Sequence, residues 1–344
     1  MVVKPSTDDP VRERFANFLY LVWVHLGLPE PTPAQYEIAD RLQYGPDAYN
    51  EVLGRTDMIR AFRGIGKSYI TAAYVLWRLY RDPVNEKILV VSASGAKSKE
   101  FVSQAKTILM TMSLMAHLRP TDEQRNSFDR FDVRGASISQ QPSLKAVGVT
   151  SQLPGNRATL IVADDIEVVE NSRTEAARET LMRQINEFEA IKVPYDETSG
   201  RPAADVLFLG TPQTLESIYN RLVRERGYAC FTIPARVPSN DKLENYELVI
   251  DETGERVNIL APFIQKMMSA SNDNTGNPTD PKRFSDEDLI SRESKGRSWF
   301  DLQYMLDTTL SDAEKYPLKQ HDLIVMNVNT YKAPLVVQWG LDGN

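Results

Sequence analysis

The chain has 344 residues, of which 42% are hydrophobic and 25% are charged, proportions typical of a globular protein with a substantial core. No run approaches the ~18 consecutive apolar residues that a membrane span needs, so no membrane partner is expected. The single cysteine, Cys230, excludes an internal disulfide and indicates a reducing cytoplasm, and the three histidines lie too far apart in the sequence to suggest a zinc site.

The net charge of -7 argues against a protein coated in basic surface for nucleic acid, but the charge is unevenly distributed. Residues 51–150 hold 15 Lys and Arg against 9 Asp and Glu, a balance of +6, which leaves -13 for the rest of the chain. Any polyanionic partner is therefore expected to meet surface built by residues 51–150. A chance excess of basic residues on solvated helices would explain the same numbers.

Two helices are predicted within an N-terminal segment over residues 1–50. Residues 11–28 have apolar positions at helical spacing and stop at Gly27. A turn with the sequence PEPTP then leads into a second short helix over residues 34–43, which starts just after a proline.

Strands and helices alternate over residues 51–235, which are predicted to form the core domain. The predicted strands cover residues 58–62, 87–94, 159–165, 204–212 and 228–234, and the predicted helices cover residues 68–82, 97–118, 173–191 and 215–225. Residues 121–150 are expected to be a polar connector with short β-like pieces. Several strands are continuous apolar runs, which is typical of an α/β fold with a mostly parallel sheet and helices on both faces.

The composition shifts after Pro234, and residues 236–344 are predicted to form a separate part of the chain. Residues 236–285 show little periodicity and are expected to be an irregular excursion. A helix is expected to begin at Ser285, because Asp288 stands three residues further on in a pattern close to a capping box. Helical spacing resumes from residue 297.

The sequence AFRGIGKS, at residues 61–68, ends like a phosphate-binding loop, whose usual pattern is G-x-x-x-x-G-K-[ST]. Gly64 and Gly66 leave room for close backbone approach to a phosphate. Lys67 would supply a point charge for the β- and γ-phosphates, and Ser68 would supply a Mg²⁺ ligand. Ala61 replaces the first glycine, which matters only if that position needs a positive φ. A chance turn before a helix would give a similar sequence.

Paired carboxylates end the apolar strand in TLIVADDIE. The carboxyl edge of an α/β sheet is where ligands bind, so these side chains are expected near the loop. A phosphate-loop ATPase needs one carboxylate for Mg²⁺ and a second to orient the attacking water. Asp164 suits the first role, whereas Asp165 and Glu167 compete for the second. A pair that only caps the next helix is the alternative.

A third strand ends in FLGTPQ, at residues 208–213. Thr211 and Gln213 are candidates to sense the γ-phosphate, as third-strand residues do in helicase-like ATPases. Taken alone, this sequence is also a common turn.

Jointly, these segments resemble the large terminase subunits of tailed phages, most closely those of short-tailed phages. The resemblance rests on MIRAFRGIGKSYIT, ILVVSAS, VGVTSQLPGNRATLIVADDIE, FLGTPQT and LSDAEKYPL. It implies a phosphate-loop NTPase of the RecA/ASCE-like kind with a small, mainly helical lid, which hydrolyses ATP with Mg²⁺ to translocate double-stranded DNA into a procapsid.

The resemblance also implies roles for individual residues. Arg63 stands four residues before the loop lysine, as an arginine does in that family, and Gln35 matches an adenine-contacting glutamine. Arg157 matches an arginine thought to act on the neighbouring subunit's ATP, with Arg63 as the within-subunit alternative. Ile65 and Tyr69 are expected to complete the nucleotide-binding set.

Lys97 and Lys99 are candidates for sequence-independent contacts with DNA phosphates, because they follow the strand ILVVSAS within the basic part of the chain. Ordinary solvated lysines would look the same.

Two departures from the family pattern matter. The family usually has Asp-Glu where this chain has Asp164-Asp165, which leaves the catalytic carboxylate open. Family members also carry an RNase H-like nuclease domain, and this chain ends at VVQWGLDGN before such a domain could fit. We therefore expect the ATPase half, as an expressed fragment, without nuclease activity.

The expected partners are double-stranded DNA, the portal protein and the small terminase subunit. The resemblance implies a homo-oligomeric ring, commonly of five subunits, in the host cell cytoplasm and transiently on the procapsid. Two other functions fit the motifs: a helicase or remodelling ATPase, although such enzymes generally use two tandem cores, and a nucleotide-binding module that does not hydrolyse.

Overall fold

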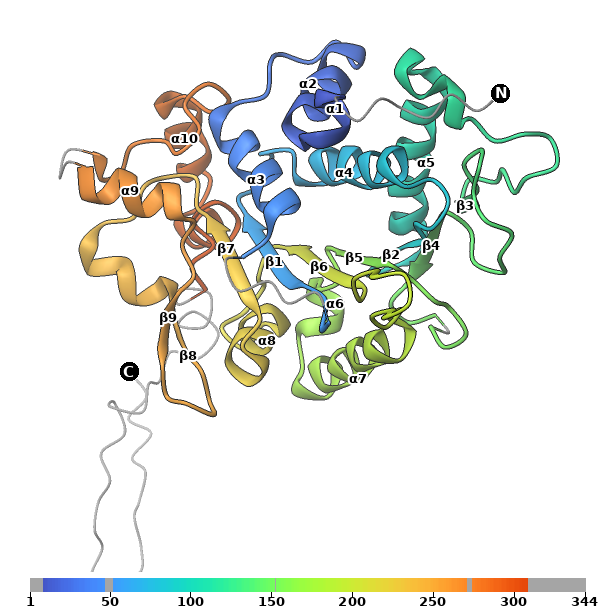
Figure 1. Ribbon diagram of the computed structural model, residues 1–344. Helices are drawn as coiled ribbons and strands as arrows, with labels where there is room; N and C mark the ends of the chain where they lie inside the picture. The colour runs from blue at the N-terminus through green and yellow to red at the C-terminus, as the bar shows by residue number, and fades with distance from the viewer. Residues whose placement is uncertain (1–8, 47–51, 152, 271–273, 309–344) are drawn as a thin grey trace, which may run out of the picture.

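The computed structural model describes residues 9–46, 52–151, 153–270 and 274–308. Its centre is a seven-stranded sheet with the order β3-β4-β2-β5-β6-β1-β7 (Figure 1). The strands are β1 (Thr56–Ala61), β2 (Ile88–Ser92), β3 (Arg130–Phe131), β4 (Leu144–Gly148), β5 (Leu160–Asp164), β6 (Asp205–Gly210) and β7 (Ala229–Ile233). Every neighbouring pair is parallel except β3 and β4. The predicted α/β fold with a mostly parallel sheet is confirmed.

Helices cover both faces of the sheet (Figure 1). One face carries α3 (Pro33–Tyr44), α4 (Lys67–Arg81) and α5 (Gly95–Thr111), with α1 (Pro10–Glu13) and α2 (Phe15–His25) packed outside them. The other face carries α6 (Val169–Ser172), α7 (Glu175–Ile191) and α8 (Ile218–Arg226). None of the helices in the described part of the chain is long and apolar enough to cross a membrane.

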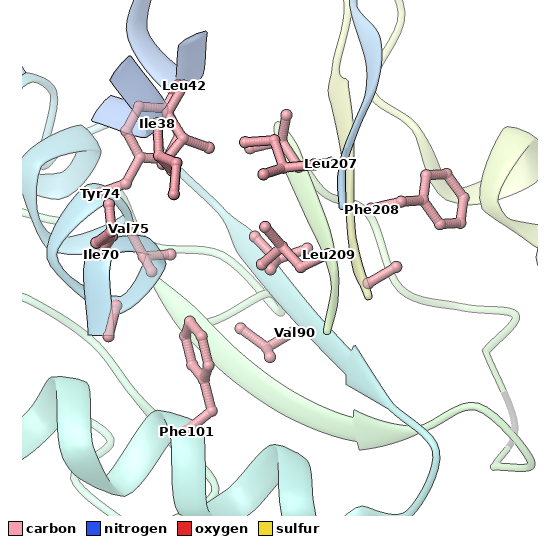
Figure 2. Close-up of a cluster of buried hydrophobic side chains, with 14 of the residues drawn as sticks. Ile38, Leu42, Ile70, Tyr74, Val75, Val90, Phe101, Leu207, Phe208 and Leu209 are labelled. Carbon is pink, nitrogen blue, oxygen red and sulfur yellow. The ribbon is translucent and has the colours of Figure 1, made fainter. Parts of the chain in front are cut away.

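The core follows from the alternation of side chains along the buried strands. On β6, Leu207 and Leu209 point toward α3 and α4, whereas Phe208 points to the opposite face (Figure 2). There the Phe208 ring lies 6.0 Å from the ring of Phe188 on α7. All four side chains are almost fully buried, and each such burial contributes about 2 kcal/mol to stability. This two-sided burial explains why the strands are continuous apolar runs.

Residues 121–150 are more ordered than the expected polar connector. They contain β4, which pairs in parallel with β2 over residues 144–148 and extends the sheet by one strand. The burial of β4 alternates, with Lys145 and Val147 half-buried between more deeply buried residues, and so the segment lacks the apolar run that marks the central strands. The predicted helix over residues 97–118 ends earlier, at Thr111, and a 3₁₀ helix follows over Ser113–Leu118.

Residues 236–285 were expected to be irregular, and here the prediction is wrong in part. The segment contains a 3₁₀ helix (Asn240–Tyr246), a hairpin of β8 (Glu247–Val249) and β9 (Arg256–Asn258), and α9 (Pro262–Ala270). These strands of three residues are too short to produce a recognisable sequence period.

The helix predicted from Ser285 is present as α10 (Asp286–Glu293), and Ser285 and Asp288 form the expected capping box. It is followed by α11 (Arg297–Phe300) and a π-helical turn (Asp301–Met305). The segment LSDAEKYPL lies outside the described residues. The division into residues 1–50, 51–235 and 236–344 stays a prediction.

Candidate functional site

The turn between β1 and α4 is the predicted phosphate loop. Ala61 is the last residue of β1 and does not belong to the positive-φ residues of the described chain, so a methyl group is tolerated there. Gly64 and Gly66 have φ values of +94° and +100°. A Cβ atom on Gly64 would lie 2.8 Å from the ring of Phe284, so this glycine is required by space as well as by conformation.

Lys67 begins α4, whose first backbone N–H groups have no acceptor within the helix. Its ammonium group donates a hydrogen bond to the carbonyl oxygen of Ala61. Burial lowers the pKa of Lys67, while the nearby carboxylates of Asp165 and Asp164 oppose this shift. A helix N-terminus and a lysine directed into the same turn form a site that favours an anion.

The two carboxylates at the end of β5 differ in conformation. Asp164 ends the strand, and Asp165 follows with a left-handed φ of +46°, held by a 2.8 Å hydrogen bond from its N–H to the carbonyl of Leu209. Such a conformation costs on the order of 1 kcal/mol in a non-glycine residue and is found preferentially at functional sites. Here it turns the second carboxylate away from the strand direction.

Asp164 is an acidic group in an unfavourable position for charge. Burial and the neighbouring Asp165 raise the pKa of Asp164 to about 7, against the effects of Lys67 and of a hydrogen bond with the Ser68 hydroxyl. The Ser68 hydroxyl therefore lies near the Asp164 carboxyl group.

Glu167 occupies a different environment from Asp165. Its side chain is buried, and its carboxylate accepts hydrogen bonds from the backbone N–H of Gln213 at 2.9 Å, the hydroxyl of Ser217 at 2.8 Å and the N–H of Ile218 at 2.6 Å. Burial raises the pKa of this carboxyl, and the three donors lower it. Glu167 is thus tied to the loop between β6 and the N-terminus of α8.

A cavity of about 700 Å³ joins these elements at the carboxyl edge of the sheet. Its lining includes these predicted site residues: Arg63, Gly64, Gly66, Lys67, Ser68, Tyr69, Lys97, Asp165, Glu167, Thr211 and Gln213. Segments that are far apart in the sequence therefore meet at one opening, as the order of the parallel strands requires.

The sequence analysis missed Val168, Val169 and Glu170, which follow the carboxylates, and four lining residues from the C-terminal part of the described chain: Arg283, Trp299, Leu302 and Gln303. The second group is the less expected. The Nε of Arg283 donates a 2.6 Å hydrogen bond to the carbonyl of Gly64, and the carbonyl of Gln303 accepts a 3.1 Å hydrogen bond from the N–H of Arg63. No spacing in the sequence marks these residues, because they reach the loop only through packing of the segment after α9.

Five predicted residues are not part of the cavity lining: Gln35, Ile65, Arg157, Asp164 and Lys99. Ile65 is fully buried within the loop, and Asp164 ends β5 next to the lining residue Asp165. Gln35 is almost fully buried, and its side-chain amide accepts a hydrogen bond from Thr32 N–H and donates a 2.7 Å hydrogen bond to the carbonyl of Ile65. Arg157 is exposed at the amino end of β5, where it donates to the carbonyl of Ala190. Lys99 is exposed on α5 and is not part of the cavity lining.

The sheet order, the glycine-containing turn before α4 and the strand-end carboxylates define a phosphate-loop α/β protein. No protein-family profile matches the chain. Over 327 residues it is 41% identical to the curated protein "Terminase, large subunit" of Enterobacteria phage T3, which corresponds to 94% of this chain and 52% of that protein. The chain belongs to the family of phage terminase large subunits, and it spans about half the length of this relative. The resemblance inferred from the sequence is confirmed.

Solved structures similar to this chain include the large terminase ATPase domain of Thermus phage P74-26, with a TM-score of 0.42 and 11% identity over 83% of this chain and 97% of that one. The large terminase of bacteriophage HK97 has a TM-score of 0.42 and 12% identity over 76% of this chain and 52% of that one. The family assignment rests on the sequence identity.

Proposed function

We propose that this chain is the ATP-hydrolysing motor part of a terminase large subunit and that it translocates double-stranded DNA into a procapsid. The observation that carries the proposal is the meeting of Lys67, Ser68 and Asp164 at one edge of the sheet, in a chain that is 41% identical to a terminase large subunit. A lysine at a helix N-terminus suits the phosphates of ATP.

The residues present fit a magnesium ion. The Ser68 hydroxyl and the nearby Asp164 carboxylate offer the oxygen ligands that Mg²⁺ prefers, and a dication would favour the charged form of this carboxyl group. When bound there with ATP, Mg²⁺ would neutralise charge on the β- and γ-phosphates. Among the described residues no group of three or more His, Cys, Asp or Glu is arranged to hold a metal ion, so phosphate and water oxygens would complete the coordination.

We assign the orientation of the attacking water to Asp165 rather than to Glu167. Asp165 lies half-buried on the cavity, whereas both oxygens of Glu167 are occupied by hydrogen-bond donors of the protein. A carboxylate that orients water needs an accepting position that faces the water. Glu167 is better placed to connect the carboxylate segment to Gln213, and Thr211 and Gln213 remain candidates to sense the γ-phosphate.

The two candidate arginines occupy opposite ends of the structure. Arg63 lies on the cavity, with a long 3.4 Å contact from its Nη1 to the side-chain oxygen of Gln303. We propose that it stabilises charge on the γ-phosphate within the same subunit. Arg157 precedes β5, and a strand of five residues is roughly 17 Å long, so it would act only on ATP held by a neighbouring subunit.

The proposed partners follow from the family. They are double-stranded DNA, the portal protein, the small terminase subunit and further copies of this chain in a ring on the procapsid, in the host cytoplasm. Lys97 lines the cavity and is better placed for a nucleotide phosphate, whereas Lys99 remains a candidate for DNA.

The test is phosphate release by the purified chain, measured alone, with double-stranded DNA and with procapsids that carry the portal. Lys67→Ala should lower the turnover on the order of 100-fold or more without a change in unfolding temperature. Lys295→Ala serves as the control, because this lysine is exposed and lies outside the cavity lining. Full turnover by Lys67→Ala would refute the proposal. Strand separation by the wild-type chain would favour a helicase, and nucleotide binding without phosphate release under all three conditions would favour a binding module.

A further inference from the structure

A second cavity, of about 490 Å³, lies at the opposite edge of the sheet from the phosphate loop. Its lining includes residues that stand at or just before the amino ends of four parallel strands: Arg55 before β1, Glu86 before β2, Thr159 before β5 and Asp205 at the start of β6. The phosphate loop and the paired carboxylates lie after the carboxyl ends of β1 and β5. Since these strands are five or six residues long, roughly 17–20 Å separates the two edges.

The second cavity has an excess of arginine. Five arginines line it, against the three carboxylates of Asp82, Glu86 and Asp205. The arginines are Arg12, Arg55, Arg78, Arg81 and Arg201. The surplus is therefore two positive charges in a partly enclosed space, which is costly unless an anion enters.

One arginine of the second cavity, Arg78, has a structural role. Arg78 forms ion pairs of 2.6 Å with Glu86 and 3.0 Å with Asp205, so it is shared between two of the carboxylates. These pairs connect α4 with the starts of β2 and β6. Arg55 approaches Asp205 only at 3.9 Å, so no other arginine of the cavity has an equivalent partner.

Arg55 is held in place but not fully satisfied. It is 5% exposed, its Nη2 donates a 3.2 Å hydrogen bond to the hydroxyl of Tyr74, and its Nε has no partner among the described residues. A Cβ atom on Gly45 would lie 2.6 Å from Cδ of Arg55, so glycine at this position makes room for the side chain. This Nε is therefore available to a water molecule or to a ligand that enters the cavity.

Three arginines have no ion pair within the described parts of the chain: Arg12, Arg81 and Arg201. Nε of Arg201 is buried and likewise has no partner there. The guanidinium of Arg81 lies over the ring of Trp77 at 4.6 Å, which holds it in position. Burial and the neighbouring cations Arg78 and Arg12 lower the pKa of Arg81, which agrees with an uncompensated positive field.

We propose that this arginine-lined cavity binds a phosphate-bearing anion, at a site separate from the phosphate loop. A phosphate group carries between one and two negative charges at neutral pH, which matches the surplus of two positive charges. The planar donor pairs of arginine fit phosphate oxygens, and the side chains converge from separate segments of the chain. The phosphate belongs either to a free anion or to the DNA backbone. This proposal does not depend on ATP hydrolysis at the first cavity.

The test uses pyrophosphate as the probe and the full chain with Lys67→Ala, so that the phosphate loop does not contribute. Titration calorimetry compares the Lys67→Ala chain with a chain that also carries Arg81→Gln and Arg201→Gln. These two substitutions remove no partner of a buried carboxylate. The control pair is Arg134→Gln and Arg183→Gln, two exposed arginines without ion pairs in the described chain.

Pyrophosphate affinity should fall about tenfold or more for each arginine removed from the cavity and stay unchanged in the control pair. A parallel titration with a short DNA duplex identifies the source: a matching loss of DNA affinity indicates backbone phosphate, and unchanged DNA affinity indicates a free anion. Equal pyrophosphate affinity in the two pairs, or no binding by the Lys67→Ala background, would overturn the proposal. If the double variant does not fold, Arg81→Gln alone decides, because that side chain is exposed.

Discussion

The carboxylate of Glu167 accepts a 2.6 Å hydrogen bond from the backbone N–H of Ile218, the first residue of α8. This contact joins the segment after β5 to the helix after β6. Both Glu167 and Asp165 line the cavity, but the Glu167 carboxylate is held by backbone donors of the segment after β6. The two residues should therefore respond differently to loss of their charge.

Glu167→Gln should destabilise the protein, because its carboxylate only accepts hydrogen bonds and an amide would direct N–H donors at one of its protein donors. The expected loss is about 1–3 kcal/mol in the free energy of unfolding, measured by denaturant titration. Asp165→Asn should leave this free energy almost unchanged, because asparagine tolerates the left-handed conformation and one like charge beside Asp164 is removed.

Phosphate release gives the complementary readout. Asp165→Asn should lower the turnover strongly while the protein stays folded. Wild-type stability of Glu167→Gln together with a complete loss of turnover would exchange the two roles and make Glu167 the residue that orients water.

Gly64 is required by space as well as by conformation, and Gly135 offers a matched control. The two glycines have φ values of +94° and +87°, but a Cβ on Gly64 meets Phe284 at 2.8 Å, whereas a Cβ on Gly135 meets nothing within 4 Å. Gly135→Ala should cost about 1–2 kcal/mol in unfolding free energy, from conformation alone. Gly64→Ala should cost more and should also weaken ATP binding. Equal losses would show that Phe284 moves aside.

Arg283 should help to hold the phosphate loop in the observed conformation through its hydrogen bond to the carbonyl oxygen of Gly64. Because the side chain is exposed, Arg283→Gln should change the unfolding free energy by less than about 0.5 kcal/mol, but it should change ATP affinity by several-fold. The exposed neighbour Lys282→Gln is the control. Titration with a fluorescent ATP analogue measures the affinity of each variant. Identical affinities for the two variants would show that Arg283 does not contribute to the site.

Trp299 should report on nucleotide binding. It is 41% exposed and lines the cavity, whereas Trp23 and Trp77 are 3% and 1% exposed. Addition of ATP should therefore alter tryptophan fluorescence in the wild-type chain, and Trp299→Phe should remove most of this change. A full response that persists in Trp299→Phe would show that Trp299 does not report on the nucleotide.

Much of the site could be predicted from the sequence because its signals are local. The loop at residues 61–68, the apolar strand before Asp164 and the turn after β6 can each be recognised within about ten residues. Ligand binding at the carboxyl edge of a parallel sheet then predicts that they meet, and they do. β4 was expected only as one of the short β-like pieces of a polar connector, because its burial alternates along the strand.

The roles of Gln35 and Arg157 remain predictions. The side chain of Gln35 lies beneath the loop with both ends of its amide in use, and Arg157 stands at the far edge of the sheet. Sequence spacing alone places neither residue relative to the cavity.

The sequence by itself determined the α/β class, the phosphate loop and the carboxylate pair, because backbone geometry and side-chain periodicity over a few residues specify such elements. Only the tertiary structure decided that the Glu167 carboxylate accepts a hydrogen bond from α8, that Arg283 reaches a loop 219 positions away, and that arginines gather at the opposite edge. These relationships depend on strand order and packing, which bring together segments whose proximity no local pattern encodes.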